Sequence, residues 1–269
     1  MRNLRLILSY DGAEFAGWQV QPGRTTVQGA LATAIGRLSA ENVLPQGSGR
    51  TDAGVHALAQ VASFATASAI PVENWMRALN DILPPSIRVL EVSEAAPEFH
   101  ARKSARAKTY RYRIYRAAIC PPFLARYVWP YPYPLQESAM VAAAGVIVGE
   151  HDFTSFAAVD PERVERMAAE SDASSAMETT NLPTTKTVTT NLRTIYSSDW
   201  TREGEELIYT VRGSGFLHHM VRNLVGTFLL VGKGTVSLED MRRILAERKR
   251  TAAGPTAPAC GLYLVGVEY

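Results

Sequence analysis

Residues 108–116, KTYRYRIYR, alternate apolar and cationic side chains at every second position. Successive side chains of a β-strand point to opposite faces of a sheet. Tyr110, Tyr112 and Ile114 therefore share one face, and the arginines between them share the other. This alternation predicts a strand near the middle of the chain that packs one face on a core and keeps the other face cationic.

The same period of two appears toward both ends of the chain. Residues 4–11, LRLILSYD, alternate leucine with other residues, and residues 261–269, GLYLVGVEY, close the chain in the same way. Residues 61–66, VASFAT, form a third apolar run. Each run is typical of a strand that is half or fully buried.

Apolar residues at helical spacing predict helices between these strands. Thr25 and Gln28 predict a capping box at the start of the first helix, and Ser237, followed by Asp240, predicts the N-cap of the last. The proline pair that begins at Pro84 ends the second helix. The predicted helices lie within residues 25–38, 72–83, 135–149, 215–232 and 237–249.

Strands and helices are mixed in both halves of the chain, which predicts an α+β fold. We expect two halves, each a small α/β sandwich whose sheet is covered on one face and open to a ligand on the other. The predicted domains are residues 1–105 and 106–269. Residues 157–190 are rich in alanine, serine and threonine, which predicts a mobile insertion in the second domain.

The composition excludes several classes of protein. Cys120 and Cys260 lie far apart and form no C-x-x-C pair, so neither a disulfide framework nor a cysteine zinc site is indicated. A reducing, cytoplasmic location is the simplest interpretation. No apolar run approaches the roughly 20 residues of a membrane-spanning helix, so no membrane association is expected.

The net charge of +2 is too small to indicate a nucleic-acid partner, but the cations are unevenly distributed. Between residues 99 and 136 the chain carries eight cations and no carboxylate. A solvated surface is the plain alternative, but interleaved tyrosines and a tryptophan favour nucleic acid, because aromatic rings stack on bases while cations meet phosphates. The eight are Arg102, Lys103, Arg106, Lys108, Arg111, Arg113, Arg116 and Arg126.

Residues 47–60, GSGRTDAGVHALAQ, place Asp52 two residues from Arg50 in a bend framed by glycines. An Asx-turn that only bonds backbone N–H groups would explain an aspartate in this position. The adjacent guanidinium points to a different role, because it would keep a partly buried carboxylate ionised. Glycines let a substrate approach the backbone closely, and a carboxylate held in this way can act as a nucleophile.

The motif GRTDAGVHA occurs in order with YDGAEFAGWQ, FHAR, KTYRYRIY, HDFTSF, HHMVRNLVG and GLYLV, and these blocks span nearly the whole chain. Together they resemble the tRNA pseudouridine synthase A family. The resemblance implies the pseudouridine synthase fold, in which two α/β sandwich halves with mainly antiparallel sheets flank a central basic cleft.

The resemblance also implies an activity. Members isomerise uridine to pseudouridine at positions 38, 39 and 40 in the anticodon stem-loop of tRNA, without a cofactor or a metal. The target nucleotide leaves the stack to reach the active site, which is base flipping. A homodimer whose tRNA spans both subunits is implied as well.

Carried over to this sequence, the catalytic aspartate of the family is Asp52 and its flanking arginine is Arg50. Tyr110 corresponds to the active-site tyrosine, whose ring stacks on the flipped base and whose hydroxyl is a candidate proton shuttle. Leu262 corresponds to an apolar residue of the pocket wall. The resemblance leaves open whether Asp52 adds to C6 of the base, adds to C1′ of the ribose or acts as a base at the sugar.

Projected as a helix, residues 215–232 gather His218, His219, Arg222 and Asn223 on one side. We predict that this face contacts RNA or supports the active site, alongside Arg102, Lys103, Arg106 and Lys108. A metal site is not expected, because adjacent helical residues diverge by about 100° and no carboxylate lies near them in sequence.

Two other functions remain open at this stage. The same basic residues would serve a non-catalytic RNA-binding or RNA-folding module, which would not need the carboxylate of Asp52. A hydrolase with an aspartate nucleophile and a small substrate is the third hypothesis. Binding of tRNA should weaken steeply as salt rises, whereas a small substrate would show little salt dependence.

Overall fold

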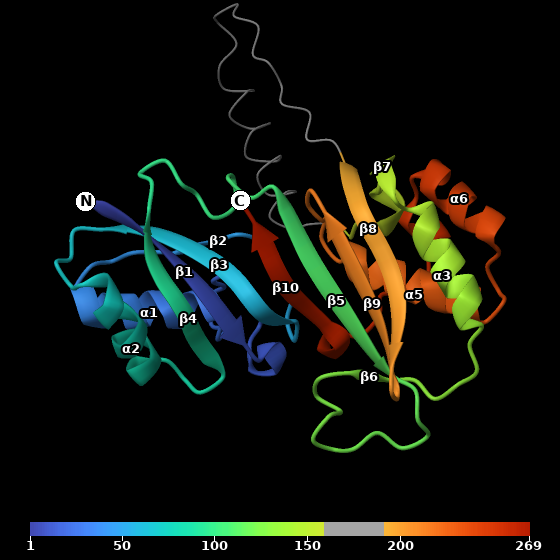
Figure 1. Ribbon diagram of the computed structural model, residues 1–269, viewed down its shortest axis with the longest axis horizontal. Helices are drawn as coiled ribbons and strands as arrows, with labels where there is room; N and C mark the ends of the chain where they lie inside the picture. The colour runs from blue at the N-terminus through green and yellow to red at the C-terminus, as the bar shows by residue number, and fades with distance from the viewer. Residues whose placement is uncertain (159–190) are drawn as a thin grey trace, which may run out of the picture.

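A sheet of ten strands runs through the computed structural model, which describes residues 1–158 and 191–269 (Figure 1). The strands are β1 (Arg2–Tyr10), β2 (Gln46–Gly47), β3 (His56–Thr66), β4 (Ile87–Ala95), β5 (Ala107–Tyr115), β6 (Trp129–Pro130), β7 (Gly149–Asp152), β8 (Leu192–Glu203), β9 (Glu206–Gly213) and β10 (Leu262–Glu268). Their order is β4-β1-β3-β10-β5-β9-β8-β7, with β2 beside β3 and β6 beside β5. Within these described ranges, only β3–β10 and β5–β6 pair in parallel.

The mixed α+β class and the mainly antiparallel sheet are confirmed, and so are the four predicted strands. In β5 the buried side chains are Tyr110, Tyr112 and Ile114, as the alternation predicts. Three long strands, β4, β8 and β9, have no counterpart among the predicted elements. Few residues of β4 and β8 are buried, so these two strands show little of the apolar alternation by which a strand is recognised.

Helices cover one face of this sheet in two groups. The helices are α1 (Val27–Ser39), α2 (Val72–Ile82), α3 (Glu137–Val146), α5 (Met220–Gly232) and α6 (Leu238–Glu247). Trp75 of α2 packs edge-on against Phe64 of β3, and Phe228 of α5 packs against Tyr209 of β9. Figure 1 shows α1 and α2 beside the N-terminal strands and α3, α5 and α6 beside the C-terminal ones.

The helix starts differ in part from the predicted caps. Ser237 and Asp240 form the full capping box of α6, which confirms that prediction. In α1 the N-cap is Thr26 rather than Thr25, so the predicted Thr25–Gln28 box is wrong. Gln28 is buried and bonds elsewhere: its side chain accepts from Val20 N–H and donates to the Pro45 carbonyl.

The last strand of the chain joins the two halves. Strand β10 lies between β3 and β5, with Tyr263 opposite His56 on β3 and Leu264 opposite Tyr110 on β5. The sheet is therefore continuous across the expected domain boundary at residue 105. Because β10 alone separates β3 from β5, the loop that precedes β3 lies near Tyr110.

The structure leaves two predictions, the mobile insertion and the domain boundary, partly or wholly untested. The predicted insertion at 157–190 lies outside the described residues from residue 159 onward. The division into domains at residue 105 stays a prediction. Across the ranges that the structure describes, no helix combines the length and the apolar character needed to cross a membrane.

Helix α5 packs so closely on residues 254–257 that Gly226 leaves no room for a side chain. A Cβ at this position would lie 1.7 Å from the Pro255 carbonyl oxygen. We expect Gly226→Ala to lower the free energy of unfolding by about 3 kcal/mol, because backbone must move to admit the methyl group. Urea denaturation measures this loss.

Gly145 of α3 provides the matched control, because no atom lies within 4 Å of a Cβ built there. Gly145→Ala should leave the free energy of unfolding unchanged or raise it slightly, since alanine favours helix. Equal stabilities of the two variants would contradict the close packing at α5.

Candidate active site

Asp52 lies in a tightly held loop, residues 48–55, between β2 and β3. Trp18 N–H donates to the Thr51 carbonyl over 3.0 Å, and Val55 N–H donates to the carbonyl of Asp52 itself over 3.1 Å. The Tyr10 and Thr51 hydroxyls bond over 2.8 Å. The loop is thus bonded to β1 and to the segment that follows it. The Asp52 side chain is 17% exposed, so it is largely buried but still reachable from solvent.

A glycine in that following segment makes the close approach possible. Gly17 adopts a φ of +95°, and a Cβ there would lie 2.6 Å from the Thr51 carbonyl oxygen. Both the dihedral angle and the space exclude other residues. The glycines of the motif YDGAEFAGWQ therefore help to position the aspartate of the motif GRTDAGVHA.

The carboxylate of Asp52 faces three nitrogen atoms from the start of α5. Arg222 Nη1 donates to Oδ2 over 2.9 Å. His219 Nε2 lies 3.4 Å from Oδ2, and His218 Nε2 lies 3.6 Å from Oδ1. The Arg222 guanidinium is itself oriented by a bond of 2.7 Å from Nε to the Ala257 carbonyl. These three groups hold the Asp52 carboxylate in one orientation.

The cation beside Asp52 is therefore Arg222 and not the predicted Arg50. Arg50 Nε donates to Gln19 Oε1 over 3.2 Å. A local sequence pattern suggested Arg50 because it is two residues away, but the loop points the two side chains to different partners. Asp52 does pair with a guanidinium, but the guanidinium belongs to Arg222, which lies 170 positions farther along the chain.

Helix α5 begins later than the periodicity predicts, and this changes the geometry of the histidines. Its first residue is Met220, and His219 precedes it with a left-handed φ of 58°. The rings of His218 and His219 lie side by side, 4.0 Å between centroids and 36° between planes. The predicted divergence of about 100° is wrong because neither histidine is inside the helix.

The convergence of two imidazoles and a carboxylate raises the question of a metal. Their ligand atoms all lie within 4.8 Å of one another, and zinc accepts such a set. However, the guanidinium of Arg222 already contacts Oδ2, and a dication would have to displace it. The prediction that no metal binds stays a prediction, although the geometric reason given for it is wrong.

Tyr110 and Leu262 lie on the helix-covered face of the sheet, next to this loop. Tyr110 is 7% exposed, packs edge-on against Phe216 and holds its hydroxyl near Gly49, where a Cβ would be 3.9 Å away. Burial raises the pKa of Tyr110, and Tyr10 and Asp52 raise it further, so the phenol keeps its proton. Leu262, which is buried, lies opposite Tyr112, two pairs along the ladder from Tyr110 and on the same face.

Asn223 is a correction to the predicted RNA-binding face. It is fully buried, its Nδ2 donates to the Phe156 carbonyl over 2.7 Å, and its Oδ1 accepts from Arg250 and Thr256. Its amide is thus used inside the protein. The projection fails because α5 is buried almost all around, so a polar residue on it does not indicate a solvent-facing side.

The basic run between residues 99 and 136 does not form one patch. Arg102, Lys103 and Arg106 are exposed before β5. Lys108 Nζ donates to the Ser48 carbonyl over 2.6 Å, and burial lowers its pKa to about 8, assisted by the positive charges of Arg102 and Arg193. These cations therefore gather at the end of β5 that is nearer the Asp52 loop.

Three of the four cations farther along the chain pair with carboxylates. Arg113 pairs with Glu206, and Arg116 pairs with Glu137. Arg126 lies within ion-pair distance of Asp11 in the same way. The single basic patch is thus wrong, because the cations before β5 and those after it lie at opposite ends of a strand about 30 Å long.

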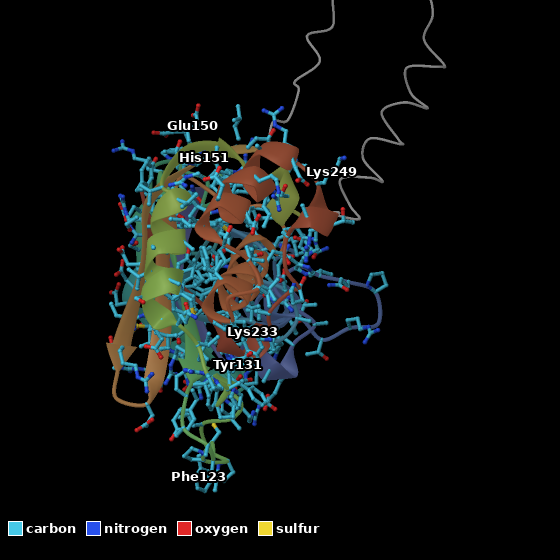
Figure 2. The ribbon with its side chains drawn as sticks, turned by 90° about the vertical axis from the view of Figure 1, so that its right-hand side faces the viewer. Phe123, Tyr131, Glu150, His151, Lys233 and Lys249 are labelled. Atoms are coloured by element: carbon cyan, nitrogen blue, oxygen red, sulfur yellow. The ribbon has the colours of Figure 1, made fainter. Side chains whose placement is uncertain are left out.

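The interleaved aromatic residues mostly serve packing. Tyr112 is fully buried and its hydroxyl donates to the Pro258 carbonyl over 2.7 Å. The Tyr127 hydroxyl donates to Asp11 over 2.9 Å. Phe123, in the loop after β5, is 90% exposed and lies at the outer end of the molecule (Figure 2). Tyr112 and Tyr127 are therefore not free to stack on bases.

Comparison with known proteins places these residues in a family. A family model described as tRNA pseudouridine synthase matches residues 6–102 and 178–269. The chain is 47% identical to tRNA pseudouridine synthase A of Solibacter usitatus over the full length of both proteins. It is 44% identical to tRNA pseudouridine synthase A of Moorella thermoacetica over 99% of each.

The chain belongs to the tRNA pseudouridine synthase family. A solved Cbf5–Nop10–Gar1 complex also matches, at a TM-score of 0.33 and 9% identity, over 97% of this chain and 57% of that one. A TM-score of 0.33 is too low to show that the two proteins share a fold.

The residues that match the model of the tRNA pseudouridine synthase family include Asp52, Arg222, Leu262 and both histidines, whereas Tyr110 falls between the two matched ranges. The structure brings all of these toward one side of the sheet. The motif HHMVRNLVG was recognised in sequence, but the contact of Arg222 with Asp52 was not predicted. No local pattern reveals it, because the two lie on separate elements.

Proposed function

We propose that this protein isomerises uridine to pseudouridine at positions 38, 39 and 40 in the anticodon stem-loop of tRNA, with Asp52 as the nucleophile. The observation that carries the proposal is the Asp52 carboxylate, largely buried, ion-paired with Arg222 and flanked by two imidazoles. Membership of the tRNA pseudouridine synthase family supports the substrate class.

The geometry suits the chemistry of this isomerisation. The bond from N1 to C1′ breaks, the uracil rotates, and C5 joins C1′, so the site needs an ionised carboxylate beside a sheltered base. Arg222 holds the Asp52 carboxylate in place before the reaction begins, which is preorganisation rather than rearrangement during the reaction. Because the target base is stacked in the RNA, it has to flip out to reach Asp52.

The remaining roles follow the same proposal. Tyr110 stacks on the flipped base, Leu262 forms an apolar wall, and Arg50 contacts the substrate near Gln19. Phosphates of the anticodon arm meet the exposed Arg102, Lys103 and Arg106 beside Lys108. A homodimer, a cytoplasmic location and a central basic cleft belong to the proposal and rest on the family resemblance.

An unmodified tRNA transcript with uridine at all three positions tests the proposal directly. After incubation with the protein, carbodiimide mapping should show pseudouridine at 38, 39 and 40. A matched transcript with cytidine at these positions should show none there. If the transcript binds but contains no pseudouridine, the proposal is overturned in favour of a non-catalytic RNA-binding module.

A further inference from the structure

His219 has a backbone conformation that its position does not require. Three non-glycine residues in the described part of the chain have a positive φ, and two of them, Ala40 and Arg248, end helices, where the left-handed conformation is common. His219 stands at the start of a helix, where extended backbone is usual. Strain of this kind gathers at functional sites.

This conformation places two consecutive imidazoles against one carboxylate. Extended or helical backbone would point adjacent side chains in different directions. Instead, His219 Nε2 and His218 Nε2 lie 3.4 and 3.6 Å from the two oxygens of Asp52. The His219 side chain is 29% exposed and that of Arg222 is 15% exposed, so the imidazole is the more accessible to a bound base.

The surroundings of His219 favour its neutral form. Burial lowers the pKa of His219, and the nearby charges of His218, Arg222 and Arg250 lower it further, against the opposing effect of Asp52. A neutral imidazole has one ring nitrogen that can accept a proton. Tyr110, the other candidate for proton transfer, is held as a neutral phenol by its raised pKa.

We propose that His219 is the base that removes the proton from C5 in the last step of the isomerisation. This inference rests on the proposed function and names a catalytic residue for it. The geometry that carries it is an accessible imidazole within 3.4 Å of the carboxylate at which the reacting nucleotide is held.

The step balances in atoms and electrons. After C5 has joined C1′, C5 still carries its hydrogen, and N1 and C6 share a double bond. A ring nitrogen of the neutral His219 imidazole takes the C5 proton. The C5–H electron pair becomes the C5=C6 double bond, and the N1=C6 pair moves to N1, which takes a proton from water. The imidazolium returns its proton to solvent.

Deuterium at C5 tests this step. We compare tRNA transcripts made with ordinary uridine and with uridine deuterated at C5, in single turnovers with excess enzyme. His219→Asn is the decisive variant, because asparagine tolerates a positive φ but has no basic nitrogen. It should form pseudouridine about 10²-fold more slowly than the wild type, with a larger isotope effect, since loss of a base slows that step selectively.

His151→Gln is the matched control, because His151 lies on β7 and bonds the Val148 carbonyl. It should match the wild-type rate and isotope effect. In a second variant, His219→Gly, added imidazole should restore turnover. An isotope effect in His219→Asn equal to that of the wild type, whatever its rate, overturns the inference.

The two proposals fail separately. If the wild type forms no pseudouridine, the proposed function is wrong. If the wild type forms pseudouridine and His219→Asn shows no added isotope effect, only the role of His219 is wrong.

Discussion

Replacement of Asp52 with alanine is expected to lower the rate of pseudouridine formation by about 10⁴-fold or more, while tRNA binding changes only a few-fold. Under the proposed function this carboxylate is the group that attacks the nucleotide, and no other described carboxylate lies within ion-pair distance of Arg222. Removal of the nucleophile leaves the binding surface in place. Single-turnover product formation and filter binding of the same transcript measure the two quantities.

Asp52→Asn tests the charge alone, because the amide keeps the shape of the side chain. It should be nearly as inactive as Asp52→Ala. Asp81→Asn, an exposed position on α2, is the control and should retain full activity. Substantial pseudouridine formation by Asp52→Asn would show that the reaction does not need an ionised group at this position, and the proposed chemistry would then be wrong.

Replacement of Arg222 with glutamine is expected to lower kcat by about 10²-fold to 10³-fold, because Asp52 loses the donor that orients it. Arg222 also donates to the Ala257 carbonyl, so the free energy of unfolding should fall as well. Saturating tRNA in single turnovers and urea denaturation of the same variant separate the two effects.

Arg222→Lys distinguishes charge from geometry. Lysine keeps the positive charge but lacks the planar guanidinium with which Arg222 donates to Asp52 and to the Ala257 carbonyl at the same time. Arg222→Lys should therefore recover only part of the activity. Arg243→Gln on α6, whose side chain is 65% exposed and pairs with Asp240, is the control. Full activity in Arg222→Gln would contradict the role assigned to the ion pair.

Much of the architecture follows from local sequence. The alternation around Tyr110 and the apolar spacing in α2 are properties of short segments, and burial of one face is enough to select strand or helix. The Ser237 cap of α6 is equally local. Strands β4 and β8 were missed because few of their residues are buried, so the apolar alternation on which such predictions depend is short.

The motif around Asp52 also indicated a candidate reactive carboxylate from sequence, through the resemblance to a family. Its partner could not be identified in this way. Arg50 is the nearest guanidinium along the chain, whereas Arg222 is the nearest in space. Asn223 shows the same limit, since a polar residue on a helix indicates solvent only if that side of the helix is not packed.

The sequence by itself thus determined the α+β class, most of the helices and the identity of Asp52 as the candidate nucleophile. Only the tertiary structure decided which groups surround that carboxylate. The placement of β10 between β3 and β5 and the left-handed turn at His219 bring the start of α5 to the Asp52 loop. Contacts of this kind join segments 170 residues apart, and their energies depend on packing that short-range patterns do not encode.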